Sequence, residues 1–167
     1  IRGASALAGA FLLDRSFFFV GLSYLVLLSG YSMWLKHSAI LDVLAIAFGF
    51  VLRALAGSVV LHVPFSHWLL VLTLLLALFL ATAKRRAELV ALAGGAKTHR
   101  PILEHYSVPM LDQMLSVVMA CTLLAYAFYT ISPETVAKFG TDHLLFTLPL
   151  PIYGLFRYLY LIHRGDS

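Results

Sequence analysis

Two charged residues share one long apolar segment of the sequence. Asp42 and Arg53 are eleven positions apart, and at about 3.6 residues per helical turn this spacing places both side chains on nearly the same face of a helix. Gly49 and Gly57 lie four positions on either side of Arg53, so this face can approach another helix closely. An arginine inside a membrane costs about 2.5 to 3.5 kcal/mol on insertion scales and therefore faces a partner or a water-filled cavity. Two interpretations stay open: a structural tie to an acidic side chain, or an anion-binding residue, which we favour.

A second group of charges follows another apolar segment. The sequence there reads Lys84-Arg85-Arg86-Ala87-Glu88, and because Glu88 comes about one helical turn after Lys84 and Arg85, we expect the helix to continue through the group. Such a group is typical of an anchor at the cytoplasmic membrane surface. It also has the density of positive charge that binds phosphate, with arginine as a bidentate donor and lysine as a point charge. A carboxylate among these cations can orient them or help to hold a divalent metal.

Three further polar residues are weaker candidates. Tyr31 and Lys36 close the apolar segment that precedes Asp42, where a tyrosine can simply pack and a lysine commonly extends its amine to the membrane surface. Tyr106 lies in the polar stretch that follows Glu88. The seven histidines are scattered without metal-ligand spacing, so a zinc site is not expected.

Long apolar segments must position these residues. Of 167 residues, 61% are hydrophobic and 12% are charged, against about 45–50% and about 25% in soluble domains, which indicates a membrane protein and excludes a soluble enzyme. A helix needs about 20 apolar residues to cross the bilayer, so the length allows five or six helices. The apolar segments lie at approximately residues 3–13, 16–35, 40–61, 66–83, 112–131 and 143–162. The first is interpreted as the end of a helix that begins earlier, and Pro149 and Pro151 are expected to kink the last. The single cysteine, Cys121, excludes an intrachain disulfide.

One long polar stretch separates the fourth and fifth apolar segments. It runs from about residue 84 to about residue 112 and is too long for a simple connector, so we expect a functional loop. When the loops are assigned alternately to the two sides of a membrane, eight cations fall on the side of this loop, whereas only Arg15 and Lys138 fall on the other. Because short cytoplasmic loops are enriched in Lys and Arg, this side is predicted to be the cytoplasmic side of the cell membrane. A nucleic-acid partner is not expected, and residues 1–167 are predicted to form one membrane domain.

Three stretches together resemble one family of membrane enzymes. They are residues 31–37, residues 42–57, which read DVLAIAFGFVLRALAG, and residues 78–89, which read LFLATAKRRAEL. They are similar to the UbiA-type intramembrane prenyltransferase superfamily, and within it to the decaprenyl-phosphate phosphoribosyltransferase branch. The most specific parts are the Lys-Arg-x-x-Glu pattern that ends at Glu88 and the Arg-x-x-x-Gly pattern of Arg53 and Gly57. Ordinary members of the superfamily carry a second Asp-rich motif where this chain carries cations.

The resemblance implies an all-α polytopic transmembrane bundle of nine helices, of which this chain would hold the end of helix three through helix eight, about five full spans plus one partial helix. It also implies the transfer of a phosphoribosyl group from 5-phosphoribosyl diphosphate to a polyprenyl (decaprenyl) phosphate, with release of diphosphate, in the synthesis of lipid-linked arabinose for the cell envelope. The residues expected to neutralise the substrate phosphates, to position those cations or to hydrogen-bond the donor are Lys36, Arg53, Lys84, Arg85, Glu88, Asp42, Tyr31 and Tyr106.

The resemblance also says what this segment lacks. In the family, the motif Asn-Asp-x-x-Asp-x-x-x-Asp holds Mg²⁺, so Mg²⁺ is the implied cofactor. This motif would precede Ile1, so most of the Mg²⁺ ligands are expected to lie outside this sequence. No catalytic residue is assigned within the chain, and the segment alone is expected to be inactive. One alternative is a prenyltransferase of the same fold that moves a polyprenyl chain from its diphosphate to an aromatic acceptor, which would require the Asp-rich second motif. Another is a transporter or structural subunit in which Arg53 and Asp42 line an ion path.

Overall fold

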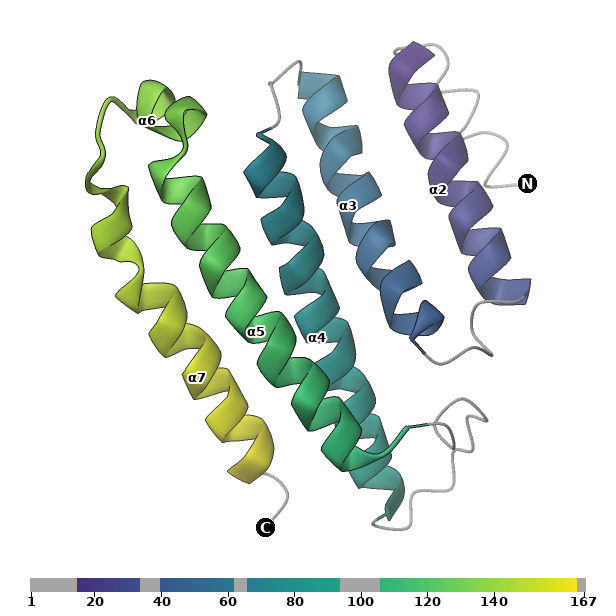
Figure 1. Cartoon of the computed structure of the whole chain (residues 1–167). Coiled ribbons are helices and arrows are strands. Elements are labelled where there is room, and N and C mark those ends of the chain that lie inside the picture. Colours follow the sequence, from purple (N-terminus) through teal and green to yellow (C-terminus); the bar gives the residue numbers. More distant parts are fainter. Residues whose placement is uncertain (1–14, 34–39, 62–65, 94–105, 165–167) are drawn as a thin grey trace. The chain divides into compact units, whose positions relative to one another are not determined.

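The computed structural model describes residues 15–33, 40–61, 66–93 and 106–164, and all regular secondary structure in these ranges is helical (Figure 1). The elements are α2 (Arg15–Met33), α3 (Leu41–Leu61), α4 (His67–Ala93), α5 (Val108–Ile131), α6 (Pro133–Phe139), the 3-10 helix η3 (His143–Thr147) and α7 (Pro149–Arg164). The predicted short segment at residues 3–13 lies outside the described residues.

Four helical segments in the described ranges are long and apolar enough to cross a membrane: Leu41–Leu61, His67–Leu92, Val108–Ile131 and His143–Arg164. The predicted span at 16–35 coincides with α2, whose apolar part, Gly21–Tyr31, is shorter than these four. The predicted class, an all-α polytopic membrane protein, is confirmed.

The polar stretch is helical at both ends, so the predicted loop at 84–112 is shorter than expected. α4 continues through the charged turn to Ala93, because residues 84–93 contain good helix formers and no glycine or proline. α5 begins at Val108, where the side chain of Ser107 accepts a hydrogen bond from the backbone N–H of Met110 at 3.3 Å. Residues 94–105, the middle of the predicted loop, lie outside the described residues.

The last apolar segment is broken near the predicted prolines. η3 ends at Thr147 and α7 begins at Pro149, a first-turn position where the missing backbone N–H of proline costs little. The prolines therefore start a new helix rather than bend a continuous one. Before η3, the short helix α6 ends at Phe139 and is capped by Gly140, whose positive φ of 67° suits a residue without a Cβ atom.

The chain divides into two compact units, Ile1–Phe65 and Ser66–Ser167. In the first unit, α2 packs against α3. In the second unit, α4 and α5 lie side by side (Figure 1), and α7 adds to a core in which Phe79, Ala83 and Leu115 are fully buried. The ring of Phe79 contacts that of Tyr158 on α7, with centroids 5.5 Å apart. The single membrane domain proposed for residues 1–167 stays a prediction.

Candidate phosphate-binding site

Arg85 and Glu88 form an ion pair on the charged turn of α4. Nη1 of Arg85 donates to Oε2 of Glu88 at 2.5 Å, and the side chain of Arg85 is only 3% exposed. A buried guanidinium requires a carboxylate or other acceptor, because burial of an unpaired charge costs several kcal/mol. Glu88 therefore fixes the orientation of a cation, as its place one turn along the helix predicts.

The three cations of this turn have three different surroundings. Lys84 is exposed, Arg85 is buried against Glu88, and Arg86 is buried against another helix. In the sequence the three cations look equivalent, because nothing there shows which of their side chains are buried against other residues. The structure distinguishes them. The exposed side chain of Lys84 can change conformation to contact an anion, whereas ion pairs hold the two buried arginine side chains in one orientation.

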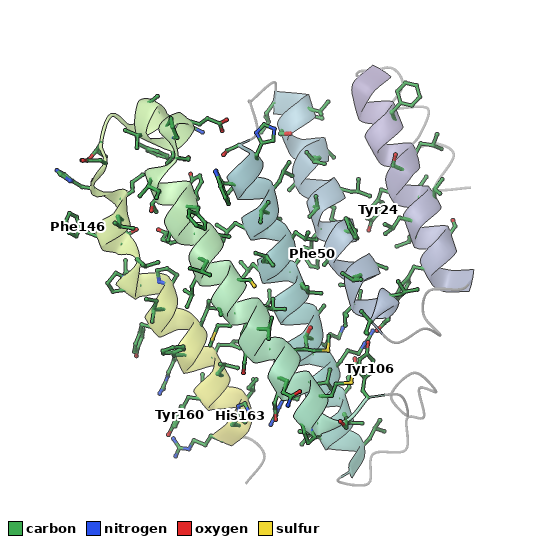
Figure 2. All side chains as sticks on the ribbon, viewed as in Figure 1. Tyr24, Phe50, Tyr106, Phe146, Tyr160 and His163 are labelled. Atoms are coloured by element: carbon green, nitrogen blue, oxygen red, sulfur yellow. The ribbon has the colours of Figure 1, made fainter. Side chains whose placement is uncertain are left out.

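Arg86 joins three helices at one end of the second unit. Its Nε donates to Oδ1 of Asp112 on α5 at 2.5 Å, and its Nη1 donates to the carbonyl oxygen of Ile162 on α7 at 3.5 Å. Nε2 of His163, near the end of α7 (Figure 2), lies 3.3 Å from the same Asp112 oxygen. We name Arg86, Asp112 and His163 the three-helix tie.

Sequence reasoning missed this tie. Asp112 appears there only as part of a polar stretch, and His163 only as one of seven scattered histidines. The three residues are far apart in the sequence, so no local spacing connects them. The available signal is weak: each is a polar residue at the end of an apolar segment, and such ends meet when neighbouring helices pack antiparallel.

In the first unit, the two charged residues of α3 both contact tyrosines of α2. The hydroxyl of Tyr31 donates to Oδ1 of Asp42 at 2.7 Å, and Asp42 is 1% exposed. Nη2 of Arg53 donates to the hydroxyl of Tyr24. Asp42 and Arg53 thus face the same neighbouring helix, which confirms that they share a face of α3.

A groove of about 140 Å³ runs between α2 and α3 in this unit. Its polar side chains are Tyr24, Tyr31 and Arg53, and the rest of its wall is apolar. Gly49 lines the groove and faces α2, as its spacing from Arg53 predicts, but a Cβ there would lie 3.7 Å from the Tyr24 ring, in ordinary contact, so the packing does not require a glycine. Gly57 is exposed, and no described atom lies within 4 Å of a Cβ built there, so the close approach at this second glycine stays a prediction.

Comparison with known proteins finds several relatives that share one name. No family model matches the chain. The decaprenyl-phosphate phosphoribosyltransferase of Mycobacterium tuberculosis is 26% identical over 157 residues, which cover 93% of this chain and 52% of that protein. The chain is homologous to these transferases. The proteins of the same name in Mycolicibacterium smegmatis and Corynebacterium glutamicum are 34% identical over 112 residues and 30% identical over 106 residues.

These relatives confirm the resemblance found in the sequence to the decaprenyl-phosphate phosphoribosyltransferase branch. The chain spans about half the length of the first relative, and 35% and 32% of the other two. In the latter two the match covers 66% and 64% of this chain. Together with its long apolar helices, the homology identifies a multi-pass membrane protein related to phosphoribosyltransferases.

The predicted site residues fall into both units. Tyr31, Asp42 and Arg53 belong to the first unit, and the second contains Lys84, Arg85, Glu88 and Tyr106. The structure pairs Tyr31 with Asp42 and Arg85 with Glu88. Tyr106 is 6% exposed and immediately precedes α5, and Lys36 lies outside the described residues. The convergence of these residues on one substrate stays a prediction.

The described carboxylates do not by themselves form a site for the Mg²⁺ that the family resemblance implies. No group of three or more His, Cys, Asp or Glu side chains with metal-binding geometry occurs in the described ranges. Asp42 already accepts a hydrogen bond from Tyr31, and Glu88 is paired with Arg85. Both carboxylates are thus already engaged by protein groups.

Proposed function

We propose that the protein to which this chain belongs transfers a phosphoribosyl group from 5-phosphoribosyl diphosphate to a polyprenyl phosphate and releases diphosphate. The relatives carry the name of this activity, with decaprenyl phosphate as the acceptor. The observation in the structure that carries the proposal is the buried Arg85 held by Glu88 beside the exposed Lys84. The product would supply lipid-linked arabinose for the cell envelope, and the site would face the cytoplasm at the plasma membrane.

The reaction is mainly a problem of charge. The bond between ribose C1 and the diphosphate oxygen breaks with its electron pair on diphosphate, and a lipid phosphate oxygen forms the new bond to C1. Negative charge grows on the leaving group and positive charge on the ribose ring, so groups fixed in advance at those positions stabilise the transition state. Arg85, held in one orientation by Glu88, is such a group, and Lys84 adds a second positive charge to the same turn.

The chain needs no activated nucleophile for this reaction. The attacking lipid phosphate is already an anion, so no general base has to remove a proton from it. Mg²⁺ is proposed as the cofactor on the family resemblance alone, with its ligands outside the described residues, and it would supply further positive charge to the diphosphate. The cations at residues 84–86 stand where a prenyltransferase of this fold would carry an Asp-rich motif, so the transfer of a prenyl chain to an aromatic acceptor is the less favoured function.

Substitutions in the charged turn test the proposal in the complete protein. Lys84→Ala and Arg85→Lys should each lower the rate of radiolabel transfer from 5-phosphoribosyl diphosphate into extractable lipid by at least about tenfold, because each removes a charge or a bidentate donor from the transition state. Lys138→Ala, which removes an exposed cation of α6, is the matched control and should leave the rate unchanged.

Two results would contradict this function. One is wild-type turnover by both variants of the charged turn, which would reduce the cations to a membrane anchor. The other is a wild-type protein that forms no phosphoribosyl lipid but prenylates an aromatic acid. Insertion into the membrane, measured in parallel, separates lost chemistry from a lost fold.

A further inference from the structure

Arg53 is a charge in the middle of a membrane span. It lies eleven residues after Asp42 on α3, which is about 16 Å along the helix axis and so close to the centre of a hydrocarbon core about 30 Å thick. Its side chain is exposed in the structure. An arginine at this depth faces water, an anion or a polar partner.

The neighbours of Arg53 are neutral. The hydroxyl of Tyr24 accepts its hydrogen bond, and the guanidinium carbon lies 5.2 Å from the centroid of the Tyr24 ring and 5.6 Å from that of Phe50. Within the described ranges no carboxylate pairs with Arg53, so nothing there neutralises its charge. A guanidinium carries five N–H donors, and Tyr24 takes one of them.

Tyr24 adds a second donor at the same place. Since its hydroxyl oxygen accepts from Arg53, its own O–H can be donated to another acceptor. Both side chains line the groove between α2 and α3, whose remaining wall includes Leu27, Leu28 and Ile46. The groove therefore combines a cationic, hydrogen-bonding corner with an apolar wall, a combination that fits a phosphate attached to a hydrocarbon chain.

We propose that Arg53 and Tyr24 bind the phosphate of the polyprenyl phosphate acceptor, with the first part of its chain against the apolar wall of this groove. The inference rests on the proposed function and separates its two substrates. The chain of a polyprenyl phosphate is dissolved in the bilayer, so this substrate can enter the groove from the membrane and place its phosphate on Arg53, whereas a water-soluble sugar diphosphate meets the charged end of α4 first. Arg53 is thus assigned to the phosphate of the acceptor alone, whereas the sequence predicts only that it neutralises substrate phosphates in general.

A binding experiment tests the site without requiring turnover. The complete protein in lipid nanodiscs should bind radiolabelled decaprenyl phosphate saturably, and Arg53→Gln should weaken this binding by at least about tenfold because a charge-assisted contact is lost. Tyr24→Phe keeps the ring over Arg53 and removes only the hydroxyl, so we expect about threefold to tenfold weaker binding. Arg157→Gln is the matched control: Arg157 is also an exposed arginine in a span, 5.4 Å from the ring centroid of Tyr160, and its loss should change nothing.

Competitors identify what the site recognises. Unlabelled decaprenyl phosphate should displace the label, whereas decaprenol, which lacks the phosphate, and inorganic phosphate, which lacks the chain, should displace it poorly. Equal displacement by decaprenol would overturn the proposal, because the phosphate would then contribute nothing. Displacement by inorganic phosphate alone would assign the site to a free anion, and unchanged binding by Arg53→Gln would remove Arg53 from the site.

Steady-state kinetics separate this inference from the proposed function. In the transfer assay, Arg53→Gln should raise the KM for polyprenyl phosphate at least about tenfold and change the KM for 5-phosphoribosyl diphosphate less than about twofold. A rise confined to the donor KM would overturn the assignment to the acceptor. If the wild-type protein transfers no phosphoribosyl group, the proposed function fails, while the binding experiment still decides the lipid-phosphate site.

Discussion

Asp42 shows how a buried charge is held in this protein. The carboxylate is 1% exposed and accepts a hydrogen bond of 2.7 Å from Tyr31 on the neighbouring helix. A buried carboxylate without such donors would be costly, so the tyrosine that the sequence predicts as a contact to the donor substrate has a structural task as well. In the Arg85–Glu88 pair the buried group is the cation instead, and the carboxylate of Glu88 accepts its hydrogen bond.

Removing the Tyr31 hydroxyl should therefore destabilise the protein. Tyr31→Phe leaves the ring in place and deprives Asp42 of one donor, which should lower the free energy of unfolding by about 1 to 3 kcal/mol. Thermal unfolding of the purified complete protein measures the change. Tyr153→Phe is the control, because Tyr153 is exposed on α7 and makes no described hydrogen bond. Equal midpoints for the two variants would show that the Tyr31 contact contributes nothing.

For single residues, the sequence predicts the helix face on which a side chain lies better than it predicts which residue that side chain contacts. The spacing of Asp42 and Arg53 correctly places them on one face, because a helical repeat is a local property. It does not predict that tyrosines of α2 meet both, since that depends on how two helices pack. The same limit applies at Gly57, where the spacing permits a close approach without indicating which helix would make it; no described atom lies within 4 Å of a Cβ built there.

Between elements, the three-helix tie of Arg86, Asp112 and His163 joins α4, α5 and α7. Both ring nitrogens of His163 face oxygen atoms, with Nδ1 2.8 Å from the carbonyl oxygen of Leu159 and Nε2 3.3 Å from Oδ1 of Asp112. A carbonyl and a carboxylate oxygen only accept hydrogen bonds, so the N–H of the imidazole can be donated to either of them. Asp112 accepts from Arg86 and lies within reach of His163, so this carboxylate connects all three helices.

Asp112→Asn should loosen this end of the second unit. Arg86 is 4% exposed and Asp112 is 34% exposed, so we expect a loss of about 2 to 3 kcal/mol, less than the 3 to 5 kcal/mol typical of a fully buried broken pair. Chemical unfolding of the complete protein measures the loss. Asp142→Asn, at an exposed aspartate that lies 3.1 Å from His143, should change stability by less than about 1 kcal/mol. A similar effect of the two substitutions would contradict the role of the tie.

The elements themselves were largely predictable. Long apolar segments predict α3, α4, α5 and the η3–α7 segment, because the bilayer requires helices of this length. The continuation of α4 follows from the one-turn spacing of Glu88 and Lys84. At Pro149 the sequence predicts a kink in one helix, whereas the structure begins a new helix there. The tie was not predictable, because its three residues come from three separate segments of the sequence.

For the molecule as a whole, the orientation in the membrane decides which substrates can reach which unit. α5 contains 24 residues and is therefore about 36 Å long, enough to separate the two aqueous sides. Ser107 precedes this helix and Lys138 follows it on α6. The excess of Lys and Arg predicts that the Ser107 side is cytoplasmic, where the proposed water-soluble phosphoribosyl donor would meet the charged turn of Lys84 and Arg85.

Labelling from outside the cell tests this orientation. Both positions are exposed, so cysteines introduced by Ser107→Cys and Lys138→Cys are accessible from water on their own sides. In a background that carries Cys121→Ser, a membrane-impermeant maleimide should label Lys138→Cys in intact cells and Ser107→Cys only after permeabilisation. Labelling of Ser107→Cys in intact cells would reverse the orientation. The cations of α4 would then lie on the side away from the cytoplasm, and this result would contradict the proposed transfer from a cytoplasmic donor.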